Sequence, residues 1–205
     1  MTLVKLCGMR SERDVHEAAE AGADAIGMVL TPGFCRSVGL GDAAKMARLI
    51  PKGVMSVGVF VDSPAEGVAF MAESLGLKAV QLHGSESDGY ISRLRSMTDA
   101  AIIKSFIVRS AEDIRKAGSS SADLILLDGG MGSGKAFDTS LLSLMGREYI
   151  LAGGLTPDSV SEAVIKLHPY AVDVSSGIET DGAKDPEKMR AFVRGAKTAG
   201  KGACI

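Results

Sequence analysis

Two side chains that can transfer protons end apolar runs in this 205-residue sequence. Cys7 ends the run Leu3–Cys7, and Asp128 ends the run Leu124–Asp128. A thiol whose pKa is lowered by its surroundings can act as a general base, and a carboxyl group whose pKa is raised by burial can act as a general acid. Each also has a plainer interpretation, because a lone Cys is often a small buried hydrophobe and an Asp before glycines is often a turn or helix cap.

Glycine and serine follow the last two apolar runs of the chain. These residues are Gly153 and Gly154 after one run, and Ser175, Ser176 and Gly177 after the other. Turns of this kind can point several backbone N–H groups at one anion, so they predict a phosphate site. Two ordinary tight turns are the alternative interpretation.

Three further polar residues occupy places where they could contact a ligand. Arg36 lies in the loop after the second apolar run, and its guanidinium could hold a carboxylate through two parallel hydrogen bonds. His83 follows the fourth run, and Asp173 lies near the end of the eighth. A solvated surface arginine and a hydrogen-bonded structural histidine are the alternatives.

Another glycine cluster, Gly129–Ala136, nearly matches the phosphate-binding loop of nucleotide hydrolases. Gly129, Gly134 and Lys135 have the spacing of that motif. Ala136 stands where the motif carries the Ser or Thr hydroxyl that ligates magnesium. The cluster therefore predicts a loop that closes over a substrate rather than a nucleotide site.

These residues must be positioned by eight short apolar runs that alternate with helical stretches. Several runs are apolar on consecutive residues, which is typical of parallel strands buried on both faces. An open doubly wound sheet shares this alternation, but the strand count favours a closed (β/α)8 barrel, the TIM barrel of the α/β class, with 1–205 as one domain. All the strand ends named above would then meet at one mouth. The expected strands are Leu3–Cys7, Ala25–Leu30, Met55–Val61, Ala79–Leu82, Ala101–Phe106, Leu124–Asp128, Tyr149–Ala152 and Ala171–Val174.

Local signals mark several helix ends. The segment Ser63–Glu66 predicts a capping box with proline at the first helical position, and residues 185–186 repeat the cap followed by proline. Gly76 and Gly118 are expected to close two helices. The segment Lys197–Ile205 is expected to fray beyond the last helix.

Composition narrows the function classes. The net charge of −2 and the absence of a Lys/Arg cluster disfavour binding to nucleic acid. No apolar stretch reaches the ~18 residues of a membrane span, and no signal-peptide pattern is present, so we expect a cytoplasmic protein that does not contact a membrane. Three cysteines and three histidines are scattered without ligand spacing, which predicts neither a disulfide framework nor a metal site.

Read in chain order, a set of motifs resembles the phosphoribosylanthranilate isomerases of tryptophan biosynthesis. The resemblance covers nearly the whole chain, and the ordered set is more specific than any single motif. The motifs are Lys5–Gly8, Val57–Phe60, Gln81–Gly84, Leu127–Asp128, Gly132–Asp138, Leu151–Leu155 and Asp173–Glu179.

The resemblance implies an Amadori rearrangement of N-(5-phosphoribosyl)anthranilate to 1-(2-carboxyphenylamino)-1-deoxyribulose 5-phosphate, without a cofactor or metal. It assigns the general base to Cys7 and the general acid to Asp128. It further implies that Arg36 binds the anthranilate carboxylate, that His83 and Asp173 contact the substrate, and that the glycine-serine turns bind phosphate. The family's usual proline before this arginine is replaced by Cys35. The expected partner is a phosphorylated small molecule, and the expected state is a monomer or homodimer.

Two other classes stay open beside this resemblance. A ribulose-phosphate epimerase normally needs metal-binding histidines at strand ends, which are not evident here. An indole-glycerol-phosphate synthase needs catalytic lysines and a longer N-terminal segment, and Lys104 in the fifth strand, the lysine that could be put forward, is insufficient alone. A catalytically silent barrel that binds a phosphorylated metabolite is the alternative outside enzymes.

Overall fold

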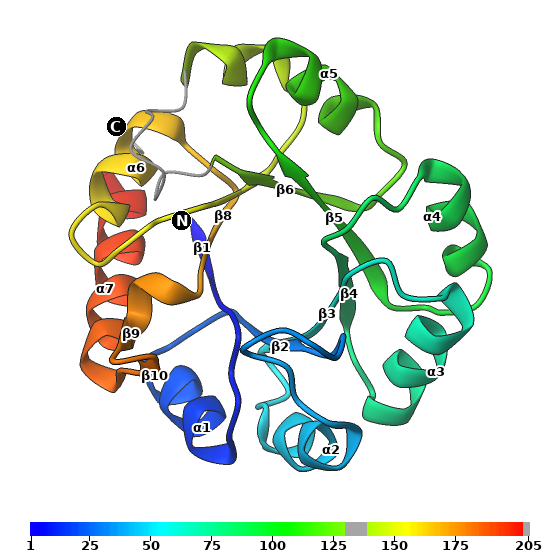
Figure 1. Cartoon of the computed structure of the whole chain (residues 1–205). Helices are drawn as coiled ribbons and strands as arrows, with labels where there is room; N and C mark the ends of the chain where they lie inside the picture. The colour runs from blue at the N-terminus through cyan, green and yellow to red at the C-terminus, as the bar shows by residue number, and fades with distance from the viewer. Residues whose placement is uncertain (130–138, 203–205) are drawn as a thin grey trace.

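The chain folds as a closed ring of eight parallel strands, paired in chain order, with the first strand also bonded to the last (Figure 1). The computed structural model describes residues 1–129 and 139–202. Helices surround the ring, so the predicted (β/α)8 barrel is confirmed. The strands are β1 Leu3–Leu6, β2 Ala25–Val29, β3 Met55–Phe60, β4 Ala79–Leu82, β5 Ala101–Ile107, β6 Leu124–Asp128, β7 Ile150–Ala152 and β8 Ala171–Val174. The helices are α1 Glu12–Glu20, α2 Leu40–Leu49, α3 Ala65–Leu75, α4 Asp88–Arg95, α5 Ala111–Ser119, α6 Val160–Leu167 and α7 Pro186–Gly202.

Alternate residues of each strand face the inside of the barrel. In β6, Leu124 and Leu126 join an apolar cluster inside the ring, whereas Ile125 and Leu127 pack in the larger layer between ring and helices. Both sets are apolar because both faces of the strand are covered. Asp128 takes the next inward position, so the alternation itself directs its carboxyl group toward the mouth.

The predicted capping box before α3 is wrong. Pro64 occupies the N-cap position, and its side chain makes no capping hydrogen bond. The Ser63 hydroxyl instead donates to the carbonyl of Val61 at 3.3 Å, within the loop. The cap before α7 is confirmed, because Oδ1 of Asp185 accepts from the backbone N–H of Glu187 at 2.9 Å.

The two glycines expected to close helices behave differently. Gly76 follows α3 with a φ of 60°, the left-handed conformation that ends helices. Gly118 lies inside α5, so the expectation that it ends the helix is wrong. A Cβ at Gly118 would stand 2.8 Å from the carbonyl oxygen of Met145. The position therefore has no room for a side chain, because the backbone at Met145 passes close to it.

The last helix continues further than expected. The segment from Lys197 was predicted to fray, but α7 extends through Gly202. The Lys197 ammonium donates to the carbonyl of Gly22 at 2.8 Å and to Asp24 at 3.0 Å, so the segment is fastened to the loop between α1 and β2. Residues 203–205 lie outside the described part of the chain.

A small hairpin that the sequence did not predict follows β8. It begins after a short 3-10 helix, Ser176–Ile178, and pairs β9 Glu179–Thr180 with β10 Ala183–Lys184 in antiparallel fashion (Figure 1). Asp181 and Gly182 form the turn with φ of 51° and 76°, as a two-residue hairpin loop requires. The hairpin carries the side chains of Glu179 and Lys184 to the barrel mouth.

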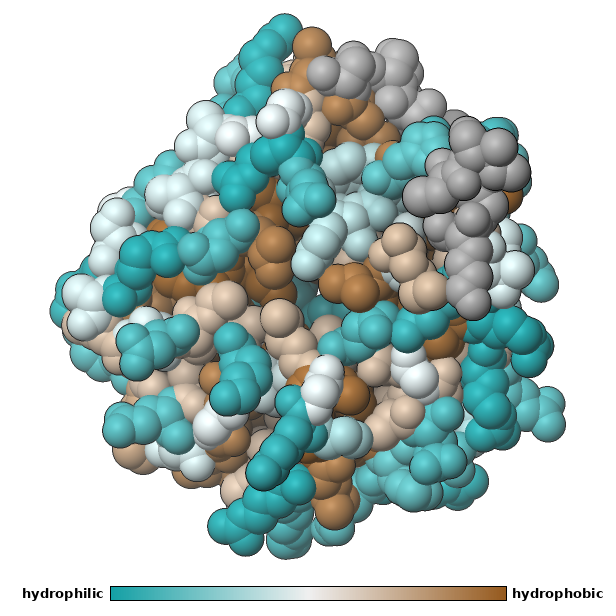
Figure 2. All heavy atoms as spheres, turned by 180° about the vertical axis from the view of Figure 1, so that it is seen from behind, coloured by the Kyte–Doolittle hydropathy of each residue, from teal (hydrophilic) through white to brown (hydrophobic). Residues whose placement is uncertain are grey.

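The glycine cluster after β6 falls largely outside the described residues. Of Gly129–Ala136, only Gly129 is described, and the first element after it is the 3-10 helix Thr139–Leu144. The predicted loop closure therefore stays a prediction. In the described ranges no helix has the length and apolar character needed to cross a membrane. From behind, hydrophilic side chains cover much of the rim and break up the apolar areas between them (Figure 2).

Gly118→Ala is expected to lower the free energy of unfolding by about 1–3 kcal/mol, because the new methyl group would press on the Met145 carbonyl. Gly67→Ala in α3 is the matched control, since nothing lies within 4 Å of its added Cβ. That variant should gain about 0.5–1 kcal/mol from helix propensity. Urea unfolding of both proteins checks the pair, and equal shifts in the two would contradict the close approach at Gly118.

Candidate functional site

A cavity of about 390 Å³ opens at the C-terminal ends of the strands. This is the usual position of active sites in (β/α)8 barrels and a usual size for a small-molecule site. The structure brings every site residue predicted from the sequence to its lining: Cys7, Arg36, His83, Asp128, Gly153, Gly154, Asp173, Ser175, Ser176 and Gly177. A larger hollow of about 550 Å³ lies near the opposite ends of β4 and β5 and contains none of these residues.

The thiol of Cys7 sits just past β1, buried at the cavity floor. Its backbone N–H donates to the carbonyl of Val174 at 2.8 Å, which fixes it against β8. A Cβ on the neighbouring Gly27 would stand 2.8 Å from the sulfur, so that glycine leaves room for the thiol. Burial raises the pKa of Cys7, while the ammonium of Lys5 opposes the rise through its charge and a hydrogen bond.

Lys5 and Asp173 form an ion pair inside the barrel. Their Nζ and Oδ1 atoms are 2.7 Å apart, and both side chains are almost fully buried. The residues lie side by side in the register of β1 and β8. Burial alone would lower the pKa of Lys5, but Asp173 and Cys7 outweigh it and raise that pKa. A permanent positive charge therefore stands at the base of the cavity, next to the thiol.

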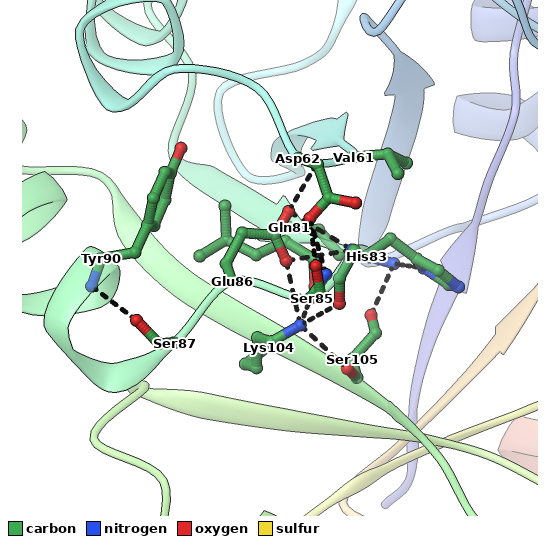
Figure 3. Close-up of polar contacts among 12 residues, drawn as sticks. Val61, Asp62, Gln81, His83, Ser85, Glu86, Ser87, Tyr90, Lys104 and Ser105 are labelled. Carbon is green, nitrogen blue, oxygen red and sulfur yellow. Dashed lines mark hydrogen bonds and ion pairs between the residues drawn. The ribbon is translucent and has the colours of Figure 1, made fainter.

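His83 follows β4 and contacts the amide of Gln81 (Figure 3). The Gln81 Nε2 atom lies 3.0 Å from Nδ1 of His83 and donates to Oγ of Ser105 at 3.2 Å. Burial lowers the pKa of His83, against the opposing charges of Asp173 and Asp128, so the imidazole is neutral at neutral pH. A neutral ring whose Nδ1 accepts from Gln81 carries its proton on Nε2.

Lys104 lies behind this group rather than in the cavity. Its ammonium is 3.0 Å from Oε2 of Glu86 and donates to the carbonyl of Gly84 at 2.7 Å (Figure 3). Glu86 in turn accepts from the backbone N–H of Asp62 at 2.9 Å. This buried ion pair ties the loops after β3 and β4 together. It gives Lys104 a structural position, outside the cavity lining where a catalytic lysine would be needed.

Arg36 reaches the cavity from the loop after β2, but a side chain of the protein itself holds one edge of it. Its Nε and Nη2 atoms donate to the two carboxylate oxygens of Glu179 at 2.7 and 2.6 Å. The hydrogen bonds from Arg36 lower the pKa of Glu179 to about 2, assisted by Lys184 and against the effect of burial. Nη1 of Arg36 lies 3.7 Å from the sulfur of Cys35, on the side away from Glu179.

The two glycine-serine turns face each other at one end of the cavity. Gly153 and Gly154 follow β7 with φ of 94° and 71°, a conformation that few other residues adopt. A Cβ on Gly177 would stand 1.9 Å from the carbonyl oxygen of Leu155, so the turn after β8 packs directly on the turn after β7. The Ser175 carbonyl accepts from the Lys184 ammonium at 2.8 Å. The same ammonium is 2.9 Å from Oε1 of Glu179, so an ion pair adjoins these turns.

The opposite end of the cavity is apolar. Val29, Phe34, Val59 and Val61 line it, from β2, β3 and the loops that follow them. Asp128 lines the same cavity at the end of β6. A ligand that fills the cavity thus meets backbone turns at one end, an apolar wall at the other, and a thiol and a carboxyl group between them.

Sequence reasoning missed four residues of this site: Lys5, Gln81, Glu179 and Lys184. The first two stand at inward positions of strands whose other inward residues are apolar, and that alternation could have identified them. Glu179 and Lys184 belong to the unpredicted hairpin, and no local signal points to them. Across the two described ranges, no group of three or more His, Cys, Asp and Glu side chains is arranged to hold a metal ion.

Asp173→Asn is expected to lower the pKa of the Cys7 thiol, because the Asp173 charge raises it and competes for Lys5. The measurement is the rate of alkylation by iodoacetamide against pH, in a Cys35→Ser/Cys204→Ser background that leaves one reactive thiol. Ser176→Ala, which changes no charge at the mouth, is the control. A midpoint in Asp173→Asn equal to that of the background protein, or above it, would refute this electrostatic link.

Glu179→Gln is expected to lower the free energy of unfolding by about 1–3 kcal/mol at neutral pH, because it removes a charge-assisted pair. Since the pKa of Glu179 is depressed to about 2 from 4.5, its contribution is full above pH 4.5 and is lost as the pH falls toward 2. Denaturant unfolding at several pH values should show the difference between the two proteins shrinking across that window. Glu162→Gln, which breaks an exposed pair with Lys166, is the control and should leave stability nearly unchanged at every pH.

Comparison with known proteins gives the chain a family. Residues 4–195 match the family model described as N-(5'-phosphoribosyl)anthranilate (PRA) isomerase. The N-(5'-phosphoribosyl)anthranilate isomerase of Citrifermentans bemidjiense is 40% identical and is matched over 96% of this chain and 98% of its own length. That of Caldanaerobacter subterraneus subsp. tengcongensis is 38% identical, over 94% and 97%.

Solved structures agree with the sequence relatives. The phosphoribosyl anthranilate isomerase of Thermotoga maritima superposes with a TM-score of 0.88 at 36% identity, covering 97% of this chain and 100% of that one. A phosphoribosyl anthranilate isomerase in complex with reduced 1-(o-carboxyphenylamino)-1-deoxyribulose 5-phosphate superposes with a TM-score of 0.86 at 34% identity, with the same coverage. By sequence and by fold, the chain belongs to the N-(5'-phosphoribosyl)anthranilate isomerase family.

Proposed function

We propose that this chain carries out the Amadori rearrangement of N-(5-phosphoribosyl)anthranilate with Cys7 as general base and Asp128 as general acid. As a member of its family, the chain is an enzyme of tryptophan biosynthesis that isomerises phosphoribosylanthranilate. One observation carries the residue assignment: the thiol, the carboxyl group and both glycine-serine turns line a single cavity. The reaction needs one base, one acid and a phosphate-binding site, and residues suited to each of these line the cavity.

The two ends of the cavity differ in polarity, and this difference predicts the orientation of the bound substrate. Its phosphate would lie on the turns after β7 and β8, where backbone N–H groups favour an anion. Its aromatic ring would lie against the apolar wall of Val29, Phe34, Val59 and Val61. The ring carboxylate would then face the Nη1 side of Arg36, whose other edge Glu179 holds in place.

In the first step, Asp128 gives its proton to the oxygen of the furanose ring. The bond between that oxygen and C1 breaks, and the nitrogen lone pair forms a C1–N double bond that carries a positive charge. In the second step, the Cys7 thiolate removes the proton from C2, and the electrons of that bond neutralise the cation as an enolamine. The enol then becomes the ketone, as C1 takes up a proton and the hydroxyl group on C2 gives up its own.

The cation of the first step helps to form the base of the second. Before the ring opens, burial keeps the pKa of Cys7 high, so the thiol is mostly protonated at neutral pH. A positive charge near the sulfur favours the thiolate, and the iminium nitrogen one bond from C1 adds such a charge to that of Lys5. The base is therefore strengthened when the adjacent carbon becomes acidic.

Relatives support the ligand class that we propose. The solved relative at 34% identity holds a reduced form of the phosphorylated product. Another, from Thermotoga maritima, is described as a dimeric enzyme from which monomers were generated. For this chain we propose a phosphorylated small molecule as the partner, in a monomer or homodimer that works without a cofactor or metal, in the cytoplasm.

Cys7→Ala and Asp128→Asn are each expected to lower turnover by at least ~10²-fold, the usual contribution of a general base or acid. The assay follows the fluorescence of freshly made phosphoribosylanthranilate as it is consumed. Asp99→Asn, at an exposed position before β5, is the control and should keep the wild-type rate. Circular dichroism of each variant checks that the barrel is folded.

Three results would overturn parts of this proposal. Turnover like that of the wild type in either active-site variant would remove the acid and base roles. Binding of the substrate without any turnover in the wild type would favour the silent barrel. Loss of activity on chelation, restored by a divalent ion, would favour the epimerase chemistry.

A further inference from the structure

The side chain of Gln81 carries an oxygen that the protein leaves without a partner. Gln81 is 1% exposed, and its Oε1 atom is the one buried side-chain N or O atom in the described ranges that has no hydrogen-bond partner. A buried carbonyl oxygen without a donor costs free energy, and native proteins rarely keep one without a reason. Gln81 also lines the cavity that contains Cys7 and Asp128.

The orientation of the Gln81 amide is held by its other end. Nε2 donates to Ser105 at 3.2 Å and lies 3.0 Å from Nδ1 of His83, so both of its hydrogens have partners (Figure 3). Ser105 is itself buried, at 7% exposure, so this partner of Nε2 lies inside the protein. The oxygen is therefore presented as a fixed acceptor that needs a donor from a ligand.

The other polar side chains around the cavity do not supply that donor. Within the described ranges, no group of the protein donates a hydrogen bond to Oε1. The Lys5 ammonium is engaged with Asp173 at 2.7 Å. A ligand N–H or O–H group is thus the partner that satisfies the Gln81 oxygen.

The position of β4 selects the part of the substrate that meets this oxygen. In the order of the barrel, β4 is separated from the phosphate turns after β7 and β8 and lies next to β3. Val59 and Val61, in β3 and the loop after it, belong to the apolar wall where the aromatic ring would rest. Between a phosphate at one end and a ring at the other, the group closest to the ring is the nitrogen that joins it to the sugar.

We propose that Gln81 is a substrate-binding residue whose Oε1 accepts a hydrogen bond from the anilino N–H of the substrate. This inference rests on the proposed function and adds a contact to it. The hydrogen bond strengthens when the ring opens, because the same nitrogen becomes an iminium and its N–H becomes a charged donor. An interaction that is stronger in the transition state than in the ground state raises kcat.

A pair of ligands tests the contact directly. The first is the reduced product, a secondary amine, and the second is the same molecule with an ether oxygen in place of the nitrogen. Wild-type protein should bind the amine about tenfold or more tightly than the ether, because the ether leaves the buried acceptor unsatisfied. In Gln81→Leu the ratio of the two dissociation constants should fall to about one, since no acceptor remains.

Gln81→Glu is the matched variant, because it keeps an acceptor oxygen at the same reach. Gln81→Glu should therefore retain a preference for the amine over the ether. If Gln81→Leu folds poorly, the ratio of the two dissociation constants in Gln81→Glu still tests the contact. Steady-state kinetics add a second readout: Gln81→Leu should lower kcat by about tenfold or more while KM changes less. A residue with only a structural role would not distinguish nitrogen from oxygen in the ligand.

The outcomes separate this inference from the function on which it rests. Equal binding of both ligands by the wild type, a preference for the ether, or an unchanged preference in Gln81→Leu would each overturn the Gln81 contact alone. A wild type that binds neither ligand would overturn the proposed function, and the Gln81 contact with it. A preference for the amine that Gln81→Leu abolishes and Gln81→Glu retains would support the contact.

Discussion

The hydrogen bonds between β1 and β8 are the constraint on which the site depends. They join the two ends of the chain and close the ring, with Lys5 beside Asp173 and Leu6 beside Val174. The backbone N–H of Cys7 extends the same ladder to Val174 by one more bond. Because all strands of the closed ring run in the same direction, their C-terminal ends lie at one side of the barrel. Residues far apart in the sequence therefore share a cavity, and contacts such as that of Arg36 with Glu179 join the loops around it.

The inward alternation of the strands decides which polar groups belong to the chemistry. Lys5 and Lys104 are both buried and both paired with a carboxylate, at 2.7 and 3.0 Å. Lys5 points into the ring and lies beside the thiol, whereas Lys104 follows the outward set of β5 and fastens a loop. A buried pair is costly unless its geometry is good and its other hydrogens are satisfied. Backbone carbonyls accept the remaining hydrogens of the Lys104 ammonium. Lys5 instead lies next to Cys7 and Asp173, which line the cavity.

The same alternation explains how much could be foreseen. The strands agree with the predicted ranges to within one residue at each end, because consecutive apolar residues identify a strand that is covered on both faces. Cys7, Asp128 and Asp173 could be assigned to the mouth because they stand near the ends of such runs. Gln81 could have been found by counting alternate positions, since it is the polar residue in an otherwise apolar strand. The hairpin and its ion pair with Arg36 could not, because that pair joins residues far apart in the chain.

Local signals failed where tertiary contacts set the outcome. Ser63 precedes a helix in a sequence that predicts an N-cap. Its hydroxyl instead donates a hydrogen bond to the carbonyl of Val61, in the loop after β3. Gly118 was predicted to end a helix because glycine is common at that position. In the structure a side chain at Gly118 would clash with the carbonyl of Met145, which follows the 3-10 helix Thr139–Leu144. Propensity and capping decide an outcome only when no stronger contact competes. At this barrel mouth the competing contacts come from neighbouring loops.

Burial of the Cys7 thiol fits the role that we propose for it, a base that is needed only briefly. A thiolate is the form of cysteine that oxidants and electrophiles attack, so a permanently ionised sulfur at the cavity floor would be open to damage. Here burial raises the pKa of the thiol and Lys5 only partly offsets it. In the proposed mechanism, the charge that completes the ionisation comes from the substrate itself, as an iminium that exists after Asp128 has opened the ring. If Gln81 accepts from that nitrogen, the protein also holds the cation at a fixed place relative to the sulfur. Acid and base are then coupled in sequence through the ligand, which explains how a thiol with a raised pKa can serve as the base at neutral pH.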